Sequence, residues 1–341
     1  MPSTSTTITS WALLVWIALQ NRGLDSHAIF KEAGLDHTKL GDGQARYRLD
    51  EMTRLWTVAV RETGDTCFGA EVGKQWTPTT FHALGFAWLA SGTLKDALQR
   101  FTRYTRIVNN SLSAKLETHG ANIHLIMETS EDESKIHSAA RDAGMTAVIT
   151  MCRLLCGDEF SPVEMHVSRE RPECHKELEK FVGCQIEFGA EQNQSLFDRI
   201  TAEKRLPTGN SELVKVNEDL AMKYLIKLDG ASIKMQVNAR LIEMMPRGHV
   251  SEDAIATQMN LSLRTLQRKL REENTSYSQV YKSIRQEMAG EYIQDPQMSM
   301  TEISYLLGFS EQANFTRAFR RWYGTSPSAA RENIQKSMVL Q

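Results

Sequence analysis

The sequence MTEISYLLGFSEQANFTRAFRRWYGTSP, residues Met300–Pro327, decides the fold of the C-terminal part of this 341-residue chain. Apolar residues at helical spacing predict a short helix before Gly308 and a second helix over Glu311–Trp322. Gly308 supplies a residue that accepts positive φ where the chain reverses, and Ser310 is expected to cap the second helix. Because the arginines of that helix lie mostly off its aromatic stripe, the pattern predicts a helix-turn-helix with a cationic exposed face.

A second copy of this pattern precedes the first at an offset of 48 or 49 residues, in Ser251–Glu273, SEDAIATQMNLSLRTLQRKLREE. Asn260 stands at the turn and Ser262 at the cap. A helix over Tyr281–Gln294, ended by Asp295-Pro296, is expected between the copies. Two units held apart in this way can present recognition helices to successive major grooves of DNA. The alternative is an all-helical domain whose arginines are merely solvated, and two matching copies make it much less probable than one would.

Side-chain chemistry divides the polar residues of the two recognition helices into two roles. Arginine can bridge guanine O6 and N7, which suits Arg264, Arg268 and Arg317, and Gln267 or Gln312 can bridge adenine N6 and N7. The residues expected at DNA phosphates are Lys269, Arg271, Arg320 and Arg321. A solvated charged face is the alternative for these four residues. For Arg268 and Arg317 the alternative is a pairing with an acidic neighbour that holds the domain together.

These residues also carry a family resemblance. The run Gly308–Pro327, together with LSLRTLQRKLREE upstream, resembles the C-terminal signature of the AraC/XylS family of bacterial transcription regulators. The resemblance implies a seven-helix DNA-binding domain, contact with double-stranded promoter DNA, and activation through RNA polymerase. By position it implies base contacts from Arg264, Thr265, Gln267, Arg268, Gln312, Asn314, Thr316 and Arg317. Ala313 departs from many relatives, which carry a larger polar residue there, and this weakens dense base readout by the second unit.

The first two thirds of the chain show a different pattern of predicted helices and strands. Helical patterns dominate up to about residue 108, a hairpin pattern follows around His119-Gly120, and mixed helix and strand signals continue to about residue 205, which predicts an α+β domain. The Ser/Thr-rich residues 1–9 are expected to be frayed. We therefore expect an α+β effector and dimerisation domain over 1–205, a linker with a connecting helix over 206–233, and an all-α DNA-binding domain over 234–341, with helix-turn-helix units at about 251–273 and 300–322.

Phe68-Gly69 and the run Leu84–Asn110 resemble the effector domain, named after arabinose binding, of one AraC subfamily. The resemblance implies a small-molecule effector without identifying it as arabinose. Residues that offer a pocket for an acidic or aromatic effector are His82, Trp88, Arg103, Tyr104 and Arg106. Ordinary core is the favoured alternative for aromatic residues at helical spacing, and an apolar or fatty effector would suit such a pocket equally well.

Composition excludes several other classes of protein. A hydrophobic fraction of 41%, a charged fraction of 24% and a net charge of −2 are ordinary for a globular protein. Trp11–Leu19 is an apolar run of nine residues, too short to span a membrane. Five cysteines, an odd number, favour a reduced, cytoplasmic setting. Cys152, Cys156, Cys174 and Cys184 make a metal or redox site conceivable, but their spacing fits no common zinc motif, so neither metal nor cofactor is expected.

The sequence thus predicts a cytoplasmic, effector-responsive, homodimeric transcription regulator that is not an enzyme. Effector binding would change the dimer geometry or release the linker, and so alter how the second domain engages DNA. One alternative is a constitutive dimeric regulator whose first domain only oligomerises. Another is an enzyme with a DNA-binding tail, for which no catalytic motif is found in residues 1–205.

Overall fold

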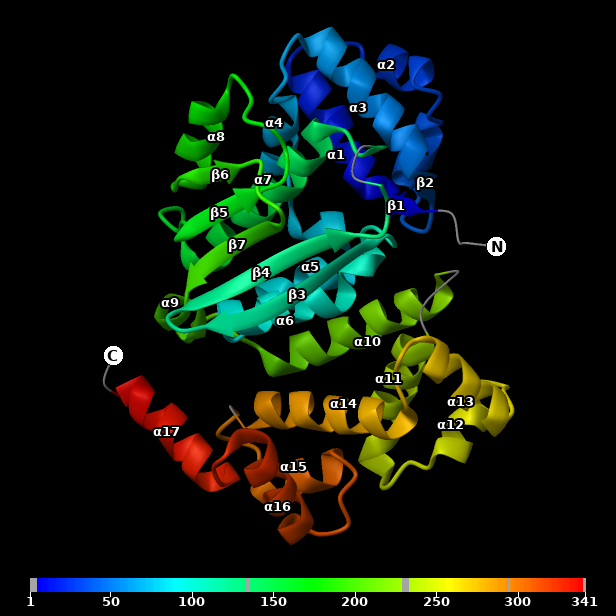
Figure 1. Cartoon of the computed structure of the whole chain (residues 1–341), viewed down its shortest axis with the longest axis vertical. Coiled ribbons are helices and arrows are strands. Elements are labelled where there is room, and N and C mark those ends of the chain that lie inside the picture. The colour runs from blue at the N-terminus through cyan, green and yellow to red at the C-terminus, as the bar shows by residue number, and fades with distance from the viewer. Residues whose placement is uncertain (1–4, 133–134, 229–232, 294, 340–341) are drawn as a thin grey trace. The chain divides into compact units, whose positions relative to one another are not determined.

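The computed structural model describes residues 5–132, 135–228, 233–293 and 295–339. The chain divides into two compact units, unit 1 over Met1–Tyr224 and unit 2 over Leu225–Gln341 (Figure 1). Within the described residues, no helix combines the length and the apolar character needed to cross a membrane. The predicted combination of an α+β part followed by an all-α part is confirmed.

Unit 1 opens with a group of helices that bury their aromatic and aliphatic faces against one another. Its helices are α1 (Thr9–Asn21), α2 (Ser26–Glu32), α3 (Leu49–Thr63), α4 (Phe68–Lys74), α5 (Ala83–Leu89) and α6 (Leu94–Tyr104), with the 3-10 turns η2 (Pro78–Phe81) and η3 (Thr105–Ile107). The expectation that residues 1–9 are frayed is wrong for the described part, because β1 (Thr6–Ile8) pairs with β2 (Arg46–Arg48) and buries Ile8 completely.

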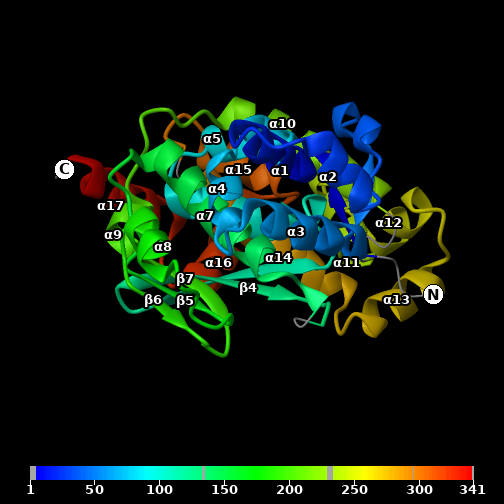
Figure 2. The same cartoon turned by 90° about the horizontal axis from the view of Figure 1, so that it is seen from above.

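A five-stranded sheet forms the second half of unit 1. Its strands are β3 (Leu112–His119), β4 (Asn122–Thr129), β5 (Glu164–Val167), β6 (Ile186–Phe188) and β7 (Asn193–Asp198), in the order β3-β4-β7-β5-β6. The β3–β4 hairpin around His119-Gly120 is as predicted, whereas β7 lies in the stretch for which only mixed helix and strand signals were expected. The helices α7 (Ser138–Cys156), α8 (His175–Val182) and α9 (Arg199–Glu203) complete the unit. Figure 2 shows α3, α4 and α7 gathered on one side of these strands.

Two glycines bring α4 and α7 into unusually close contact. A Cβ atom added at Gly69 would overlap the backbone of Ala139, and one added at Gly73 would overlap Thr146 and the carbonyl of Ala143. Both positions are buried and helical, so glycine is required here by proximity rather than by backbone conformation. The contact fixes α7 along the helical part of unit 1 while its other side faces the sheet.

The cysteines are arranged differently from the expectation of unpaired thiols. Cys67, just before α4, forms a disulfide with Cys174, just before α8. The two residues are 107 positions apart in the sequence, which hides the pairing from any local pattern. Cys152, Cys156 and Cys184 are free.

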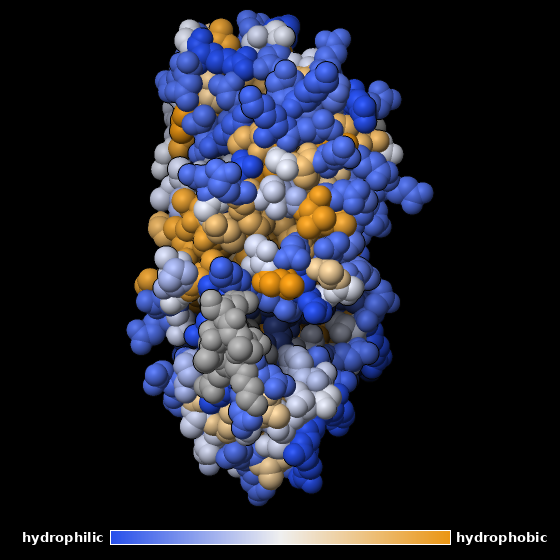
Figure 3. All heavy atoms as spheres, turned by 90° about the vertical axis from the view of Figure 1, so that its left-hand side faces the viewer, coloured by the Kyte–Doolittle hydropathy of each residue, from blue (hydrophilic) through white to orange (hydrophobic). Residues whose placement is uncertain are grey.

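Helix α10 (Ser211–Lys227) spans the division between the units. The predicted linker over 206–233 includes residues 229–232, which lie outside the described residues. Figure 3 shows hydrophobic residues gathered over part of the face of unit 1 that bears α8 and α9. Exposed apolar side chains of unit 1 include Leu154, Val163 and Ile200.

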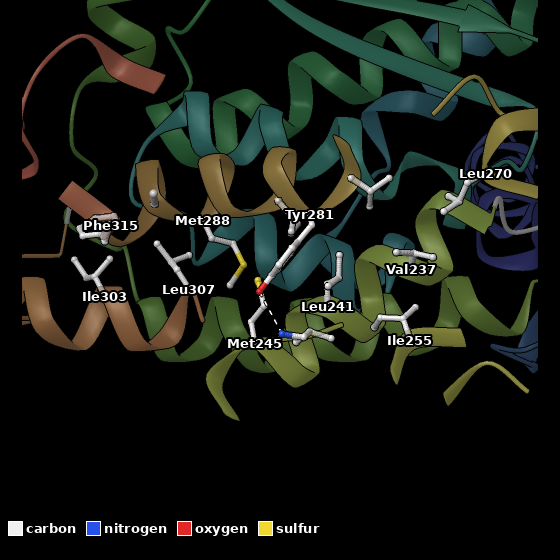
Figure 4. Packing of buried hydrophobic residues seen from close by; sticks show 14 of the residues in the cluster. Val237, Leu241, Met245, Ile255, Leu270, Tyr281, Met288, Ile303, Leu307 and Phe315 are labelled. Carbon is white, nitrogen blue, oxygen red and sulfur yellow. Dashed lines mark hydrogen bonds between the residues drawn. The ribbon is translucent and has the colours of Figure 1, made fainter. Parts of the chain in front are cut away.

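Unit 2 is helical throughout its described residues. Its helices are α11 (Ile233–Met244), α12 (Glu252–Gln258), α13 (Leu263–Glu272), α14 (Tyr277–Tyr292), α15 (Met300–Leu306), α16 (Gln312–Tyr323) and α17 (Pro327–Val339). One hydrophobic cluster runs through the unit, from Val237 and Leu270 near α13 to Ile303 and Phe315 near α16 (Figure 4). Helix α14 lies along this cluster with α12 and α13 near one end and α15 and α16 near the other (Figure 1).

Candidate nucleic-acid interface and ligand cavity

The first helix-turn-helix unit is built from α12 and α13. Ser251 Oγ accepts the N–H of Ala254 and starts α12, and the chain reverses at Asn260 with φ of 52°. Ser262 Oγ then accepts the N–H of Thr265 at 3.2 Å and starts α13. Asparagine tolerates this left-handed conformation because its short polar side chain can bond to the local backbone. The turn and the cap predicted at Asn260 and Ser262 are confirmed.

The second unit, α15 and α16, has the same turn but a different start to its recognition helix. Gly308 reverses the chain at φ of 69°, and a Cβ there would lie 2.9 Å from the carbonyl oxygen of Gly248. The predicted cap at Ser310 is wrong. Helix α16 begins after Glu311, which holds the extended cap conformation but makes no side-chain capping bond. Ser310 therefore precedes the cap position by one residue and does not start the helix.

Helix α13 exposes the first set of predicted DNA contacts. The Arg264 side chain is exposed, and within the described part of the chain it makes no hydrogen bond or ion pair. Gln267 Nε2 donates to Glu252 Oε2 at 3.1 Å, and Arg268 forms an ion pair with Glu272 one turn further on. Arg264 is thus available to DNA, whereas Gln267 and Arg268 would exchange protein partners for bases. The other predicted contacts on this helix are half-buried Thr265 and exposed Lys269 and Arg271.

Helix α16 presents the second set. Gln312 Oε1 accepts a hydrogen bond from Thr301 Oγ1 at 2.8 Å, and Arg317 Nη2 donates to Asn314 Oδ1 at 2.6 Å. These bonds leave donors of Gln312 and Arg317 exposed at the surface. The remaining predicted contacts are half-buried Thr316 and exposed Arg320 and Arg321, and Ala313 is exposed between them. Each predicted DNA contact of both helices therefore lies at the surface or half-buried, away from the aromatic core.

Arg285 of α14 positions the second unit, although no sequence pattern distinguishes it from other helical arginines. Its Nε donates to the carbonyl of Leu307 at 2.8 Å, and one Nη donates to the carbonyl of Gly308 at 2.6 Å and to Tyr281 Oη at 2.7 Å. The guanidinium also lies 4.0 Å from the ring centre of Tyr281 and 4.2 Å from that of Phe309. Arg285 thus fastens the turn of the second unit to the helix that joins both units.

Unit 1 contains a cavity of about 210 Å³. Helix α7 contributes Met145 and Met151 to its lining, the sheet contributes Met127 and Val167, and helices α1 and α3 contribute Trp11 and Trp56. The lining comes from segments between residues 7 and 195, so local sequence patterns did not reveal it. A mostly apolar cavity with a few polar groups is the usual form of a small-molecule site.

The five residues predicted to contact an effector lie outside this cavity. Trp88 is fully buried and donates its indole N–H to the carbonyl of Met151 at 2.9 Å, and Tyr104 is core as well. Arg103 pairs with Glu218 of α10 at 3.0 Å, and half-buried His82 holds a left-handed φ of 51°. Arg106 donates to the carbonyl of Asn110 at 3.3 Å. The favoured core interpretation thus describes the two aromatic residues, and the cavity lining is a second candidate effector site.

The cysteines do not converge on a metal-binding arrangement within the described residues. The group of potential metal ligands found there is Glu164, His166 and Glu187, without a cysteine. Burial raises the pKa of Cys156 to about 11, and burial with nearby carboxylates raises that of Cys184 to about 11. These two thiols are therefore protonated at neutral pH, unlike activated cysteines.

Comparison with known proteins finds one family match within each unit. Residues 23–206 match the family described as the arabinose-binding domain of AraC transcription regulator, N-terminal, and residues 255–333 match the helix-turn-helix domain family. The first match spans more than half of the chain and includes the lining from Leu49 to Ser195. The second includes both predicted recognition helices.

Several regulators are similar to this chain. The ornithine utilization regulator of Pseudomonas aeruginosa is 24% identical over 310 residues, covering 91% of each protein. The HTH-type transcriptional regulator VirS of Mycobacterium tuberculosis is 25% identical over 242 residues, covering 70% of each. The HTH-type transcriptional activator RhaS of Escherichia coli is 37% identical over 84 residues, 24% of this chain and 30% of the relative. The crystal structure of CdpR from Pseudomonas aeruginosa aligns with 94% of this chain at 18% identity and a TM-score of 0.47.

Proposed function

This chain belongs to the AraC family of transcription regulators, and we propose that it is an effector-responsive activator of a nearby metabolic or adaptive operon. Its domains and relatives are those of DNA-binding transcription regulators, not of enzymes. The observation that carries the proposal is the pair of helix-turn-helix units on α14, each with an arginine-bearing recognition helix at the surface. The 16 residues of α14 measure about 24 Å at 1.5 Å per residue, which allows the units to engage adjacent turns of one duplex.

Base readout is proposed to come mainly from the first recognition helix. Arg264 is exposed and makes no side-chain bond within the described residues, so it can bridge a guanine without first losing a protein partner. In the second helix, Arg317 already bonds to Asn314, and Ala313 offers no polar group. Arg317, Arg320 and Arg321 would then mainly hold the DNA backbone and fix the register.

Effector binding in unit 1 is proposed to act through the linker over residues 206–233. Glu218 of α10 pairs with Arg103 at 3.0 Å and with Arg100 at 3.3 Å, so the first half of α10 is fastened to α6. Phe101, which also belongs to α6, lines the cavity. A ligand that repositions Phe101 can therefore change the strain on the Glu218 contacts and on the helix that leads to the DNA-binding domain. Such a switch requires the ligand to prefer one of two states.

We further propose that the regulator works as a cytoplasmic homodimer and contacts RNA polymerase. Leu213, Val216 and Leu220 follow one another at spacings of three and four along α10, and each is more than half exposed. Apolar residues at this spacing form the seam along which two helices pair. A second copy of the same helix is the occupant that this stripe suits, because a two-fold interface uses the same residues from both partners.

The proposal is tested by a mobility-shift assay of the full chain with DNA fragments upstream of the neighbouring genes, at moderate salt. We expect at least one fragment to be retarded. Arg264→Ala should lose about 1–3 kcal/mol of discrimination at one base pair. Lys176→Ala, an exposed charge on α8, is the matched control and should bind as the unchanged protein does. If no fragment is retarded, with or without candidate effectors, the proposed function is wrong.

A further inference from the structure

The chemistry of the unit 1 cavity restricts what it can bind. Four aromatic side chains line it, and so do five methionines, Met52, Met127, Met145, Met151 and Met165. Methionine is unbranched and polarisable, so such a lining adapts its shape to a hydrocarbon ligand. Aromatic and thioether groups offer a ligand large contact area but few hydrogen bonds. Most of a bound molecule must therefore be apolar.

The charged groups of the lining already face opposite charges. Asp142 and Arg169 form a buried ion pair, and Arg141 adds a second positive charge near the same carboxylate. Glu128 pairs with Lys115 at 2.9 Å. Glu128 is therefore already balanced by a lysine outside the lining, and both arginines of the described lining lie near the Asp142 carboxylate. An ionised ligand would lose its hydration here without a counter-charge reserved for it.

The Thr105 hydroxyl is a buried polar group of the lining without a hydrogen-bond partner among the described residues: the residue is 1% exposed, and its Oγ1 makes no hydrogen bond there. His166 Nε2, also in the lining and without a hydrogen bond, lies 3.1 Å from the Glu164 carboxylate. Thr105 begins η3, directly after α6, and borders the cavity. A buried hydroxyl without a partner costs free energy that a ligand group can recover by bonding to it. Thr105 therefore marks the place at which a polar group of the ligand would sit.

We propose that this cavity binds a small uncharged molecule, mostly hydrocarbon, with one hydroxyl or carbonyl group bonded to Thr105 Oγ1. The inference rests on the proposed function, in which this molecule is the effector. An apolar cavity of about 150 Å³ can hold benzene, or about 25 Å³ for each carbon, so the volume of about 210 Å³ has room for roughly eight or nine non-hydrogen atoms. A pentose or an amino acid fits poorly, because most of its hydroxyl or charged groups would face apolar side chains.

Three probes with one chain length test the charge requirement: octan-1-ol, octanoate and octylammonium. Binding to the full chain is measured by isothermal titration calorimetry and by the rise of Tm with ligand concentration. We expect octan-1-ol to bind at least tenfold more tightly than either ion, and L-arabinose and ornithine to give no shift at the same concentration. Equal binding of octanoate or octylammonium, or no binding of octan-1-ol, would overturn the proposal.

Two substitutions test the location. A Cβ added at Gly144 meets nothing within 4 Å, and this residue of α7 borders the cavity. Gly144→Leu should therefore fill the cavity and abolish octan-1-ol binding without lowering the Tm of the free protein, since leucine also favours the helix. Unchanged octan-1-ol affinity in this variant would refute the site.

Thr105→Val tests the polar contact independently of any cavity filling. Because the Thr105 hydroxyl makes no hydrogen bond within the part of the chain that the structure describes, its removal should leave the Tm of the free protein unchanged or raised while weakening octan-1-ol binding about fivefold. The matched control is Thr146→Val, whose buried hydroxyl donates to the carbonyl of Asp142 at 2.8 Å. That variant should lower the Tm and leave the affinity within about twofold. A lower Tm or unchanged affinity in Thr105→Val contradicts the proposed contact.

The same preparations are assayed for DNA binding, so that the two proposals fail separately. A protein that retards promoter DNA but does not bind octan-1-ol would refute the cavity assignment and leave the regulator function intact. A protein that binds octan-1-ol but retards no fragment would support the cavity chemistry and refute the regulator function.

Discussion

Replacing Arg285 with methionine tests how strongly α14 holds the second helix-turn-helix unit. The substitution keeps an unbranched apolar side chain but removes the donors that bind the carbonyls of Leu307 and Gly308. It also removes the cation stacked between Tyr281 and Phe309. Burial lowers the pKa of Arg285, which shows that its charge pays a desolvation cost in the folded state.

The expected loss follows from these contacts. Two hydrogen bonds from a charged donor contribute about 1.5–3 kcal/mol each, and the cation–π contacts contribute about 1 kcal/mol. Relief of the desolvation cost returns part of this sum. We therefore expect Arg285→Met to destabilise unit 2 by about 3–5 kcal/mol. Arg240→Met is the matched control, because Arg240 makes an i,i+3 surface pair with Glu243 and should cost less than ~1 kcal/mol.

Hydrogen exchange of the full chain measures the effect where it arises, since equilibrium unfolding of a two-unit protein need not be two-state. Amide protection in α15 and α16 should fall by roughly 10²- to 10³-fold, at 1.4 kcal/mol per factor of ten. Protection in unit 1 should not change. If α15 and α16 are protected to within about threefold of the original protein, Arg285 does not fasten the turn as described.

Three further predictions follow from other parts of the structure. Gly308→Ala should lower the free energy of unfolding of unit 2 by at least ~1–2 kcal/mol because of its φ of 69°, and by more because the added Cβ approaches Gly248. Asn260→Gly at the equivalent turn should be nearly neutral. Denaturant unfolding compares the two variants. Burial lowers the pKa of His82 and His137 in folded unit 1, so as the pH falls these two imidazoles bind protons more readily in the unfolded chain than in the folded one. The contribution of these neutral imidazoles to stability is complete above about pH 6.5 and is lost as the pH falls through the lower folded-state pKa values. The Tm should therefore drop between pH 7.5 and 5.5. His137→Asn should flatten this profile of Tm against pH. Val216→Glu places a charge in the exposed stripe of α10 and should convert a dimer to a monomer in light scattering after gel filtration, with unchanged Tm; a persistent dimer would assign the interface elsewhere.

The DNA-binding unit could be predicted in detail because its signals are local. Turn residues, caps and the aromatic stripe lie within about 25 positions of one another, and Asn260 and Gly308 both hold the positive φ that their spacing implied. The predicted cap at Ser310 is wrong because Ser310 and Glu311 are adjacent, and the sequence alone does not say which of the two takes the extended cap conformation. Arg285 resembled any solvated helix arginine, since its partners are backbone carbonyls more than 20 positions away.

Unit 1 was less predictable because its features depend on distant segments. Strand β7, NQSLFD, lacks a clear alternation of polar and apolar residues and is ordered by its neighbours β4 and β5. The effector residues were sought in one stretch of the chain, His82–Arg106, where Trp88 of α5 and Tyr104 of α6 belong to the core. Single residues from helices and strands throughout the unit line the cavity. Thr105 can be singled out only from the structure, in which its buried hydroxyl makes no hydrogen bond among the described residues.

The glycine contact between α4 and α7 also determines how unit 1 can deform. With no side chain at Gly69 or Gly73 to act as a spacer, the two helices cannot roll over one another without backbone overlap, and separating them would leave a void, so we expect them to move together. Any displacement of α7 by an occupant of the cavity must carry α4 with it. Unit 1 would then deform where this helix pair borders other elements. One such place is at Arg22, just after α1, which forms ion pairs with Asp65 at 2.6 Å and with Glu71 of α4.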